Sequence, residues 1–196
     1  MKKNRRREAG PSDGRRAANP RETAFLILKE TAAGRFPEES LADHGPLLSP
    51  RDLALTTALV YEVLRRQAFL DWLLQARLSA GRAGPDLTLV LRLGLAQILY
   101  FDRLGDHAIV AETVTLAQKI VPGRQGLVNA VLRGLLRERE TGGPWPPEPP
   151  ATLGIGESLA LRHNCRLWLA TDLLKRFGQA EAEKILAAYN RPTPPL

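Results

Sequence analysis

Residues 89–138 constrain the fold most, because they contain three successive helical patterns joined by tight turns. The first pattern, 89–101, is apolar almost all round, and a helix of that kind belongs inside a bundle rather than on its surface. The second is expected to begin with Asp106 as its N-cap and to stop at Pro122-Gly123. The third carries apolar residues on one face and polar residues on the other. Together they predict an all-α module.

A further helix is predicted to begin at Asn19. Asparagine is a favoured N-cap, Pro20 suits the first helical position, and the side chain of Glu22 is expected to reach back to the cap. Gly34 is expected to end this helix. Its predicted buried side consists of Phe25, Leu26, Ile27 and Leu28.

A loop is predicted around Phe36-Pro37 and Gly45-Pro46. After it, Ser49-Pro50 again places an N-cap residue before a proline at the first helical position. The helix that begins there is expected to run to about Arg66. Another helix is predicted over 69–79. We therefore expect residues 19–140 to form one helical bundle. Its predicted core includes Leu91, Leu95, Ile98, Leu99, Val110, Val114, Val128, Val131, Leu132 and Leu135.

The composition changes after residue 140. Residues 141–156 are rich in proline and glycine around Trp145, which predicts a semi-rigid linker rather than a helix or strand. Residues 157–196 then read as the helical start of a further, truncated subdomain. The helices expected there cover 157–163, 167–177 and 180–189.

The formal net charge of +7 is concentrated at the N-terminus. Residues 1–18 lack apolar periodicity and are expected to form a disordered basic tail. A flexible cationic tail is a candidate RNA-binding element, although it is also compatible with a solubilising or nonspecific role. The candidate RNA-binding residues of the tail are Lys2, Lys3, Arg5, Arg6, Arg7, Arg15 and Arg16.

Four arginines of the predicted bundle are further RNA-binding candidates. Arg65 and Arg66 lie at the end of one helix, and Arg133 and Arg137 lie four apart on another, so that the latter two face the same way. Phosphate contact explains such pairs. The dipole of a helix C-terminus also explains both pairs. For Arg133 and Arg137, which Glu138 and Glu140 are placed to neutralise, this structural explanation is preferred.

Three other polar residues have a structural and a functional interpretation. Glu112 and Asn129 fit either hydrogen-bonded ties between adjacent helices or ligand contacts. His107 is more typical of a first-turn residue that hydrogen bonds to the loop than of a catalytic base, because five positions separate it from Glu112. Cys165 has no general base or proline-cysteine context beside it, and is expected to pack.

Several classes of site are not predicted. One cysteine and three histidines exclude a disulfide framework and argue against a structural zinc site. The basic N-terminus lacks the apolar core of a secretory signal, and no apolar run suggests a membrane span, so a cytoplasmic location is expected. Gly154 and Gly156 lack the third glycine and preceding strand of a nucleotide-binding turn. We therefore predict no catalytic, cofactor-binding or metal-binding residues in this chain.

The sequences of the central helices also resemble those of a known protein family. LRLGLAQILYFDRLGDHAIVAETVTLAQK at 91–119 and GLVNAVLRGL at 126–135, with YEVLRR at 61–66, resemble the NusB family of RNA-binding helical domains. More narrowly, they resemble the NusB-like domain of bacterial 16S rRNA 5-methylcytosine methyltransferases, the RsmB (Sun/Fmu) group. The methyltransferase pattern continues downstream, so that the likeness covers roughly 20–196. The downstream segments that carry it are Arg162-His163-Asn164, Trp168-Leu169, Phe177-Gly178 and Asn190-Arg191-Pro192.

This resemblance implies a NusB-like helical bundle that binds 16S rRNA and positions it for a catalytic domain absent from this chain. S-adenosylmethionine, the implied methyl donor, would belong to that domain, so no activity is expected from these 196 residues alone. The alternative is a stand-alone NusB-type transcription antitermination factor, and a third possibility is a protein-interaction bundle without RNA affinity. Residues 142–196 favour the methyltransferase, because they have no evident role in a NusB factor. Within them, Arg166 replaces a proline usual in the family and Tyr189 a polar residue.

Overall fold

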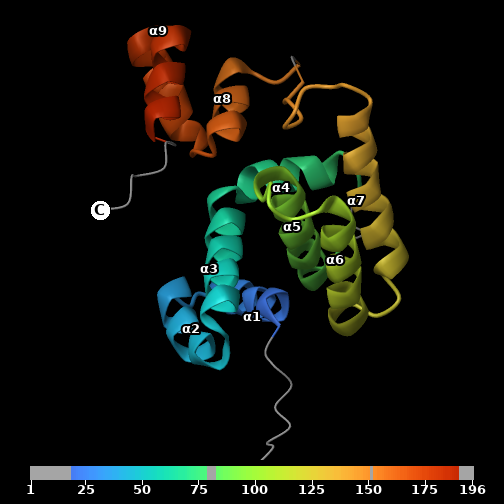
Figure 1. Ribbon diagram of the computed structural model, residues 1–196. Coiled ribbons are helices and arrows are strands. Elements are labelled where there is room, and N and C mark those ends of the chain that lie inside the picture. The colour runs from blue at the N-terminus through green and yellow to red at the C-terminus, as the bar shows by residue number, and fades with distance from the viewer. Residues whose placement is uncertain (1–18, 79–82, 151, 190–196) are drawn as a thin grey trace, which may run out of the picture.

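The computed structural model describes residues 19–78, 83–150 and 152–189, which fold as nine α-helices and one short 3-10 helix, with no strand in these ranges (Figure 1). The all-α prediction is confirmed. None of the described helices has the length and hydropathy needed to cross a bilayer. The elements are α1 (Pro20–Ala32), α2 (Pro37–His44), η1 (Gly45–Leu47), α3 (Pro50–Arg65), α4 (Gln67–Gln75), α5 (Pro85–Tyr100), α6 (Asp106–Ile120), α7 (Gln125–Glu140), α8 (Ile155–His163) and α9 (Leu167–Tyr189).

Helix α5 is the centre of the bundle, in contact with α1, α3, α4, α6 and α7 (Figure 1). Its side chains are buried on every side, which explains why its sequence shows no polar face. Gly94 lets α6 and α7 approach closely, since a Cβ there would lie 2.9 Å from Thr113 Cγ2 and from Leu132 Cδ2. Of the ten residues predicted to be in the core, nine are buried.

The exception is Val114, which is only half-buried. The buried face of α6 includes Val110, as predicted, together with Ile109, Thr113, Leu116 and Ala117, and Val114 packs only partly against the core. The prediction that Leu26 lies on the buried side of its helix is also wrong. It is 45% exposed, on the outer side of α1, because the neighbouring residues of that helix already fill its contact with α3 and α5.

Two helix starts are built as the sequence predicts. The Asn19 side chain accepts hydrogen bonds from the backbone N–H groups of Arg21 and Glu22, at 2.9 and 3.4 Å, and the Ser49 hydroxyl accepts one from the backbone N–H of Asp52. The predicted return of the Glu22 side chain to its cap is wrong, because Glu22 forms an ion pair with Lys119 of α6.

Three predicted boundaries are corrected. The predicted loop around 36–46 contains α2, whose only buried residue is Ser40, so no apolar periodicity marked it. Helix α5 begins at Pro85, four residues before the predicted start, with proline in its first turn. Asp106 is the first residue of α6 rather than its cap, and its carboxylate pairs with Arg139 of α7.

The segment after α7 crosses the end of the bundle and brings α8 beside α4 (Figure 1). On the way, Trp145 packs against the main core, and the guanidinium of Arg139 lies over its ring, 5.2 Å from the centroid. Helices α8 and α9 pack on each other around a second, small core. Gly178, with φ 74°, interrupts α9, close to the boundary predicted between two helices there.

Candidate nucleic-acid interface

The seven cationic residues of the predicted tail, between Lys2 and Arg16, lie outside the described residues. The candidates within the bundle are Arg65 and Arg66, at the end of α3, and Arg133 and Arg137, on α7. Figure 1 shows α3 and α7 on opposite sides of the bundle, with α5 and α6 between them. The fold therefore does not bring the two pairs into one patch.

The two arginines at the end of α3 have different environments. Arg66 Nε donates a 2.7 Å hydrogen bond to Glu62 Oε1, and its guanidinium lies over the Tyr100 ring, 4.4 Å from the centroid. Burial raises the pKa of Tyr100 to about 12, so this phenol stays neutral beside the cation. Arg65 is exposed and forms no ion pair with any described residue. Arg65 is thus the more available of the two for an external anion.

The two arginines of α7 are both exposed. Arg133 Nε donates a 3.0 Å hydrogen bond to the side-chain oxygen of Asn129, one turn earlier on the same helix. Glu138 does not neutralise this face, because its carboxylate pairs with Arg77, which follows α4. Asn129 therefore supports an arginine of its own helix instead of linking two helices.

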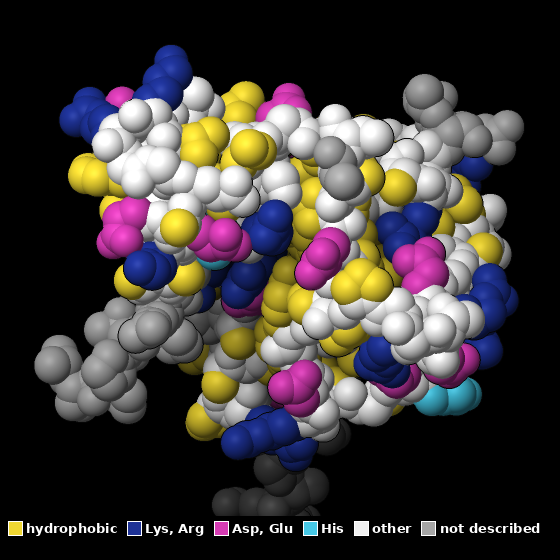
Figure 2. All heavy atoms as spheres, turned by 90° about the horizontal axis from the view of Figure 1, so that it is seen from above, with side chains coloured by type: hydrophobic (Ala, Val, Ile, Leu, Met, Phe, Trp, Pro, Cys, Tyr) yellow, Lys and Arg dark blue, Asp and Glu magenta, His cyan; other side chains and the backbone are white. Residues whose placement is uncertain are grey.

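Over the face seen in Figure 2, Lys and Arg side chains are scattered between acidic ones rather than gathered in one basic patch. Sequence reasoning missed several exposed cations that form no ion pair within the described ranges. They are Arg51, Arg103, Arg124, Arg166 and Lys175. No spacing rule singles them out, since their availability depends on which carboxylates the fold places beside the other cations.

Arg166 is the most informative of these, because it lies in the same pocket as Arg65, although 101 positions separate them. This pocket, of about 350 Å³, lies between the start of α4 and the turn that joins α8 to α9. It continues into a second, more apolar pocket of about 400 Å³, with which it shares Ala68, Asp71, Cys165 and Arg166. The two pockets together form one groove, which we call the junction groove.

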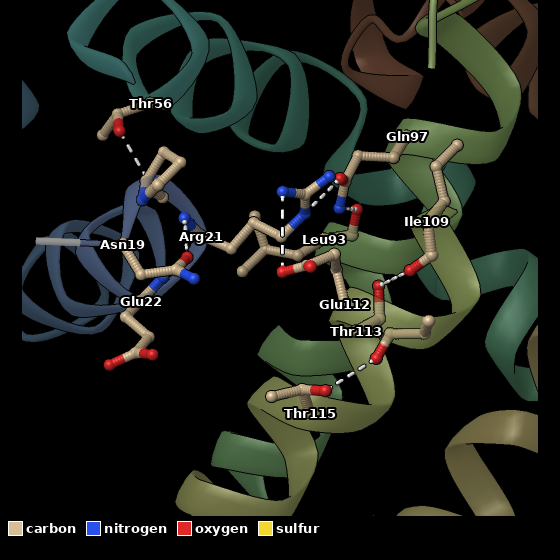
Figure 3. Close-up of polar contacts among 12 residues, drawn as sticks. Asn19, Arg21, Glu22, Thr56, Leu93, Gln97, Ile109, Glu112, Thr113 and Thr115 are labelled. Atoms are coloured by element: carbon tan, nitrogen blue, oxygen red, sulfur yellow. Dashed lines mark hydrogen bonds and ion pairs between the residues drawn. The ribbon is translucent and has the colours of Figure 1, made fainter. Parts of the chain in front are cut away.

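Glu112 takes part in a tie between helices (Figure 3). Its carboxylate lies 4.0 Å from Nη1 of Arg21, and Nε of Arg21 donates a 2.8 Å hydrogen bond to Oε1 of Gln97. Burial lowers the pKa of Arg21, and Glu112 opposes that effect. The three residues come from α1, α5 and α6, so the interpretation of Glu112 as an interhelical tie is supported.

His107 and Cys165 show no catalytic arrangement. His107 is an exposed first-turn residue of α6, but it makes no side-chain hydrogen bond to the loop, so that part of the prediction is wrong. Cys165 packs against the second core, and burial raises the pKa of its thiol. A thiol with a raised pKa is a poor nucleophile at neutral pH.

Within the described ranges, no three His, Cys, Asp or Glu residues are close enough to hold a metal ion. The same ranges contain no strand, and therefore no strand-ending glycine turn of the kind that cradles a nucleoside cofactor. We assign the described residues no step that involves S-adenosylmethionine.

Comparison with known proteins assigns this fold. The model of the NusB family matches residues 18–137, more than half of the chain. The chain belongs to the NusB family. The NusB segment comprises α1 to α7 with the exception of the last turn of α7, so the junction groove lies where this segment meets α8 and α9.

Three relatives extend the likeness. A Synechocystis protein named "Probable ribosomal RNA small subunit methyltransferase B" is 31% identical over 179 residues, covering 87% of this chain and 38% of the relative. Ribosomal RNA small subunit methyltransferase B of Thermus thermophilus is 40% identical over 124 residues, covering 61% and 30%. The enzyme of the same name from Escherichia fergusonii is 38% identical over 150 residues, covering 75% and 32%. The NusB-family chain thus spans about a third of the length of these relatives.

Proposed function

We propose that this chain is the RNA-binding module of a ribosomal RNA small subunit methyltransferase, and that it positions small-subunit rRNA for methyl transfer elsewhere in the protein. One observation carries the proposal. The likeness to the Synechocystis methyltransferase covers 87% of the chain, whereas the NusB family accounts only for residues 18–137. A stand-alone antitermination factor would leave α8 and α9 without a role.

Helices α8 and α9 support the methyltransferase assignment through their surface. Their shared core is small, and they leave several large apolar side chains exposed, which is typical of a surface that packs on another part of a protein. We assign this surface to contact with the catalytic part of the methyltransferase. The exposed apolar residues are Ile155, Leu167, Trp168, Phe177, Ile185 and Tyr189.

The chemistry belongs to that catalytic part in this proposal. The resemblance to the 5-methylcytosine methyltransferases implies transfer of a methyl group from S-adenosylmethionine to 16S rRNA. The contribution of this chain is to hold RNA, through the cationic residues of 1–18 and through Arg65, Arg66, Arg133 and Arg137. A cytoplasmic location is part of this proposal, and the proposed ribosomal RNA target supports it.

A competition experiment tests the proposal. The chain is bound to a labelled fragment of small-subunit rRNA and challenged with unlabelled rRNA fragment or with a homopolymer of equal length. We expect the rRNA fragment to compete at a concentration at least about tenfold lower, because rigid helix faces favour structured RNA over a flexible strand. Equal competition by the two RNAs, or no binding of either, would contradict the proposal.

A further inference from the structure

The junction groove combines a cationic end with an apolar end. Arg65, from the end of α3, and Arg166, from the turn before α9, both line its polar pocket and are both exposed. Two unpaired guanidinium groups that converge on one hollow are typical of a site for a phosphate.

Asp71, the one carboxylate that lines the polar pocket among the described residues, does not cancel this charge. Asp71 forms a two-pronged ion pair with Arg92 of α5, with Nε to Oδ1 at 2.7 Å and Nη2 to Oδ2 at 2.8 Å. Its negative charge is thus already matched by a cation. Cys165, the other titratable neighbour, is neutral, since burial raises the pKa of its thiol. The balance inside the polar pocket is therefore positive.

The apolar end has the size and surface that a base requires. Trp72, Leu153 and Leu161 line this end, and its volume of about 400 Å³ falls within the range of small-ligand sites, about 300–1,000 Å³. Bases of single-stranded RNA are commonly held against aromatic side chains, with the phosphate on basic groups beside them. The Trp72 side chain is half-buried and packs against the main core, with its ring centroid 5.4 Å from that of Phe69.

One hydrogen-bonding group of the polar pocket has no partner within the described protein. The side-chain oxygen of Asn164 is buried and accepts no hydrogen bond. Asn164 occupies the left-handed region, with φ 49°, where it ends α8. Because this oxygen is closed off from solvent, the site relies on the two arginines and Trp72 and not on Asn164.

We propose that the junction groove binds one nucleotide of a single-stranded RNA segment, with its phosphate at Arg65 and Arg166 and its base against Trp72. This inference rests on the proposed RNA-binding function and adds a site to it. It places an RNA contact at the boundary between the NusB segment and the two helices that follow. RNA held there is positioned relative to both parts of the chain.

Two variants of the complete chain test the phosphate end. Arg65→Gln with Arg166→Gln removes both groove cations, and the matched control, Arg51→Gln with Arg124→Gln, removes two exposed, unpaired cations outside the groove. The probe is a single-stranded RNA of 12 nucleotides with mixed sequence, titrated at fixed salt. We expect affinity to fall about tenfold for the groove variant and less than about threefold for the control.

Intrinsic fluorescence tests the base end. We expect the RNA to quench tryptophan emission and the quench to disappear in Trp72→Phe. The quench should persist in Trp168→Phe, because Trp168 is 68% exposed and does not line the groove. Thermal melts of each variant establish that it is folded. Equal loss of affinity in both arginine variants, or a quench that survives Trp72→Phe, overturns the groove site but leaves the proposed function intact. Absence of binding by the unmodified chain overturns both.

Discussion

Nε of Arg21 donates a 2.8 Å hydrogen bond to the side-chain oxygen of Gln97, joining the first turn of α1 to the last turn of the central helix (Figure 3). Both residues are buried, with 9% and 1% of their surface exposed. Gln97 also donates a 2.8 Å hydrogen bond to the backbone oxygen of Leu93. A polar contact so deep in an apolar core is sensitive to the loss of either partner.

Gln97→Leu removes the acceptor and leaves the Arg21 guanidinium buried without its hydrogen bond. We expect the free energy of unfolding to fall by about 1–3 kcal/mol, the usual cost of an unsatisfied buried polar group. Denaturant unfolding measures this change. Gln118→Leu, on the exposed side of α6, is the control and should change stability by less than about 0.5 kcal/mol. Equal effects of the two substitutions would show that the Arg21–Gln97 contact does not stabilise the bundle.

Gly94 and Gly134 should respond in opposite ways to the same substitution. Gly94→Ala places a methyl group 2.9 Å from side chains of α6 and α7, and we expect it to destabilise the fold by about 1–3 kcal/mol. Gly134 has nothing within 4 Å of its Cβ position, so Gly134→Ala should stabilise α7 by about 0.5–1 kcal/mol. Thermal melts of the two variants decide the matter. Shifts of the same sign would contradict the close approach of the helices at Gly94.

The contrast between these two glycines depends on helix packing, which the sequence did not predict. Apolar periodicity and capping residues located most helices, including the caps at Asn19 and Ser49. Periodicity cannot say which neighbours a glycine of a central helix meets, because that depends on how three helices pack. It also missed α2, an eight-residue helix whose only buried side chain is that of Ser40.

In the candidate interface, too, features within one helix were predicted and contacts between distant segments were not. The sequence predicted that Arg133 and Arg137 share a face, and both are exposed there. It did not predict that Glu138 pairs with Arg77, because 61 positions separate the two. Nor did it predict that Arg166 shares a pocket with Arg65, since the turn before α9 meets α4 only in the folded chain.

Glu30 should make the stability of the protein depend on pH in acid. Its carboxylate accepts a 2.6 Å hydrogen bond from the Ser40 hydroxyl and contacts His44 and Arg35 at 2.9 Å each. These contacts, that of Ser40 first, lower the pKa of Glu30 from 4.5 to about 2. The stabilisation is therefore complete above about pH 4.5 and is lost as the pH falls toward 2.

Glu30→Gln should accordingly destabilise the protein at pH 7, and its difference from the unmodified chain should shrink between pH 4.5 and pH 2. Urea unfolding at a series of pH values measures both effects. Glu140→Gln, which replaces an exposed carboxylate without an ion pair in the described ranges, is the control and should be nearly neutral throughout. A difference for Glu30→Gln that stays constant down to pH 3 would contradict the assigned contacts.

Deletion of residues 2–16 removes the seven cations of the predicted tail. We expect it to weaken RNA binding more than about tenfold at moderate salt and to flatten the salt dependence, because each lost phosphate contact removes about 0.7 from the log–log slope on a single strand. Filter binding measures both quantities. A deletion that leaves affinity and slope unchanged would mean that the tail only solubilises the protein and that the bundle carries the RNA site.

Substitution of Arg133 and Arg137 together by glutamine should cost less affinity than the tail deletion, but should weaken binding of structured rRNA more than binding of a homopolymer. The reason is that a helix face presents its charges rigidly. The same filter-binding assay with both RNAs measures the difference. Equal losses of affinity for the two RNAs would show that α7 does not contact the structured rRNA.

The most direct measurement is the affinity of the unmodified chain for a small-subunit rRNA fragment over a series of salt concentrations. Phosphate contacts made by part of the tail and by the exposed arginines predict a log–log slope of about −2 to −4. Such a slope, with binding that homopolymer RNA displaces poorly, is the result that the RNA-binding assignment predicts. No detectable binding at low salt, or a slope near zero, would contradict it.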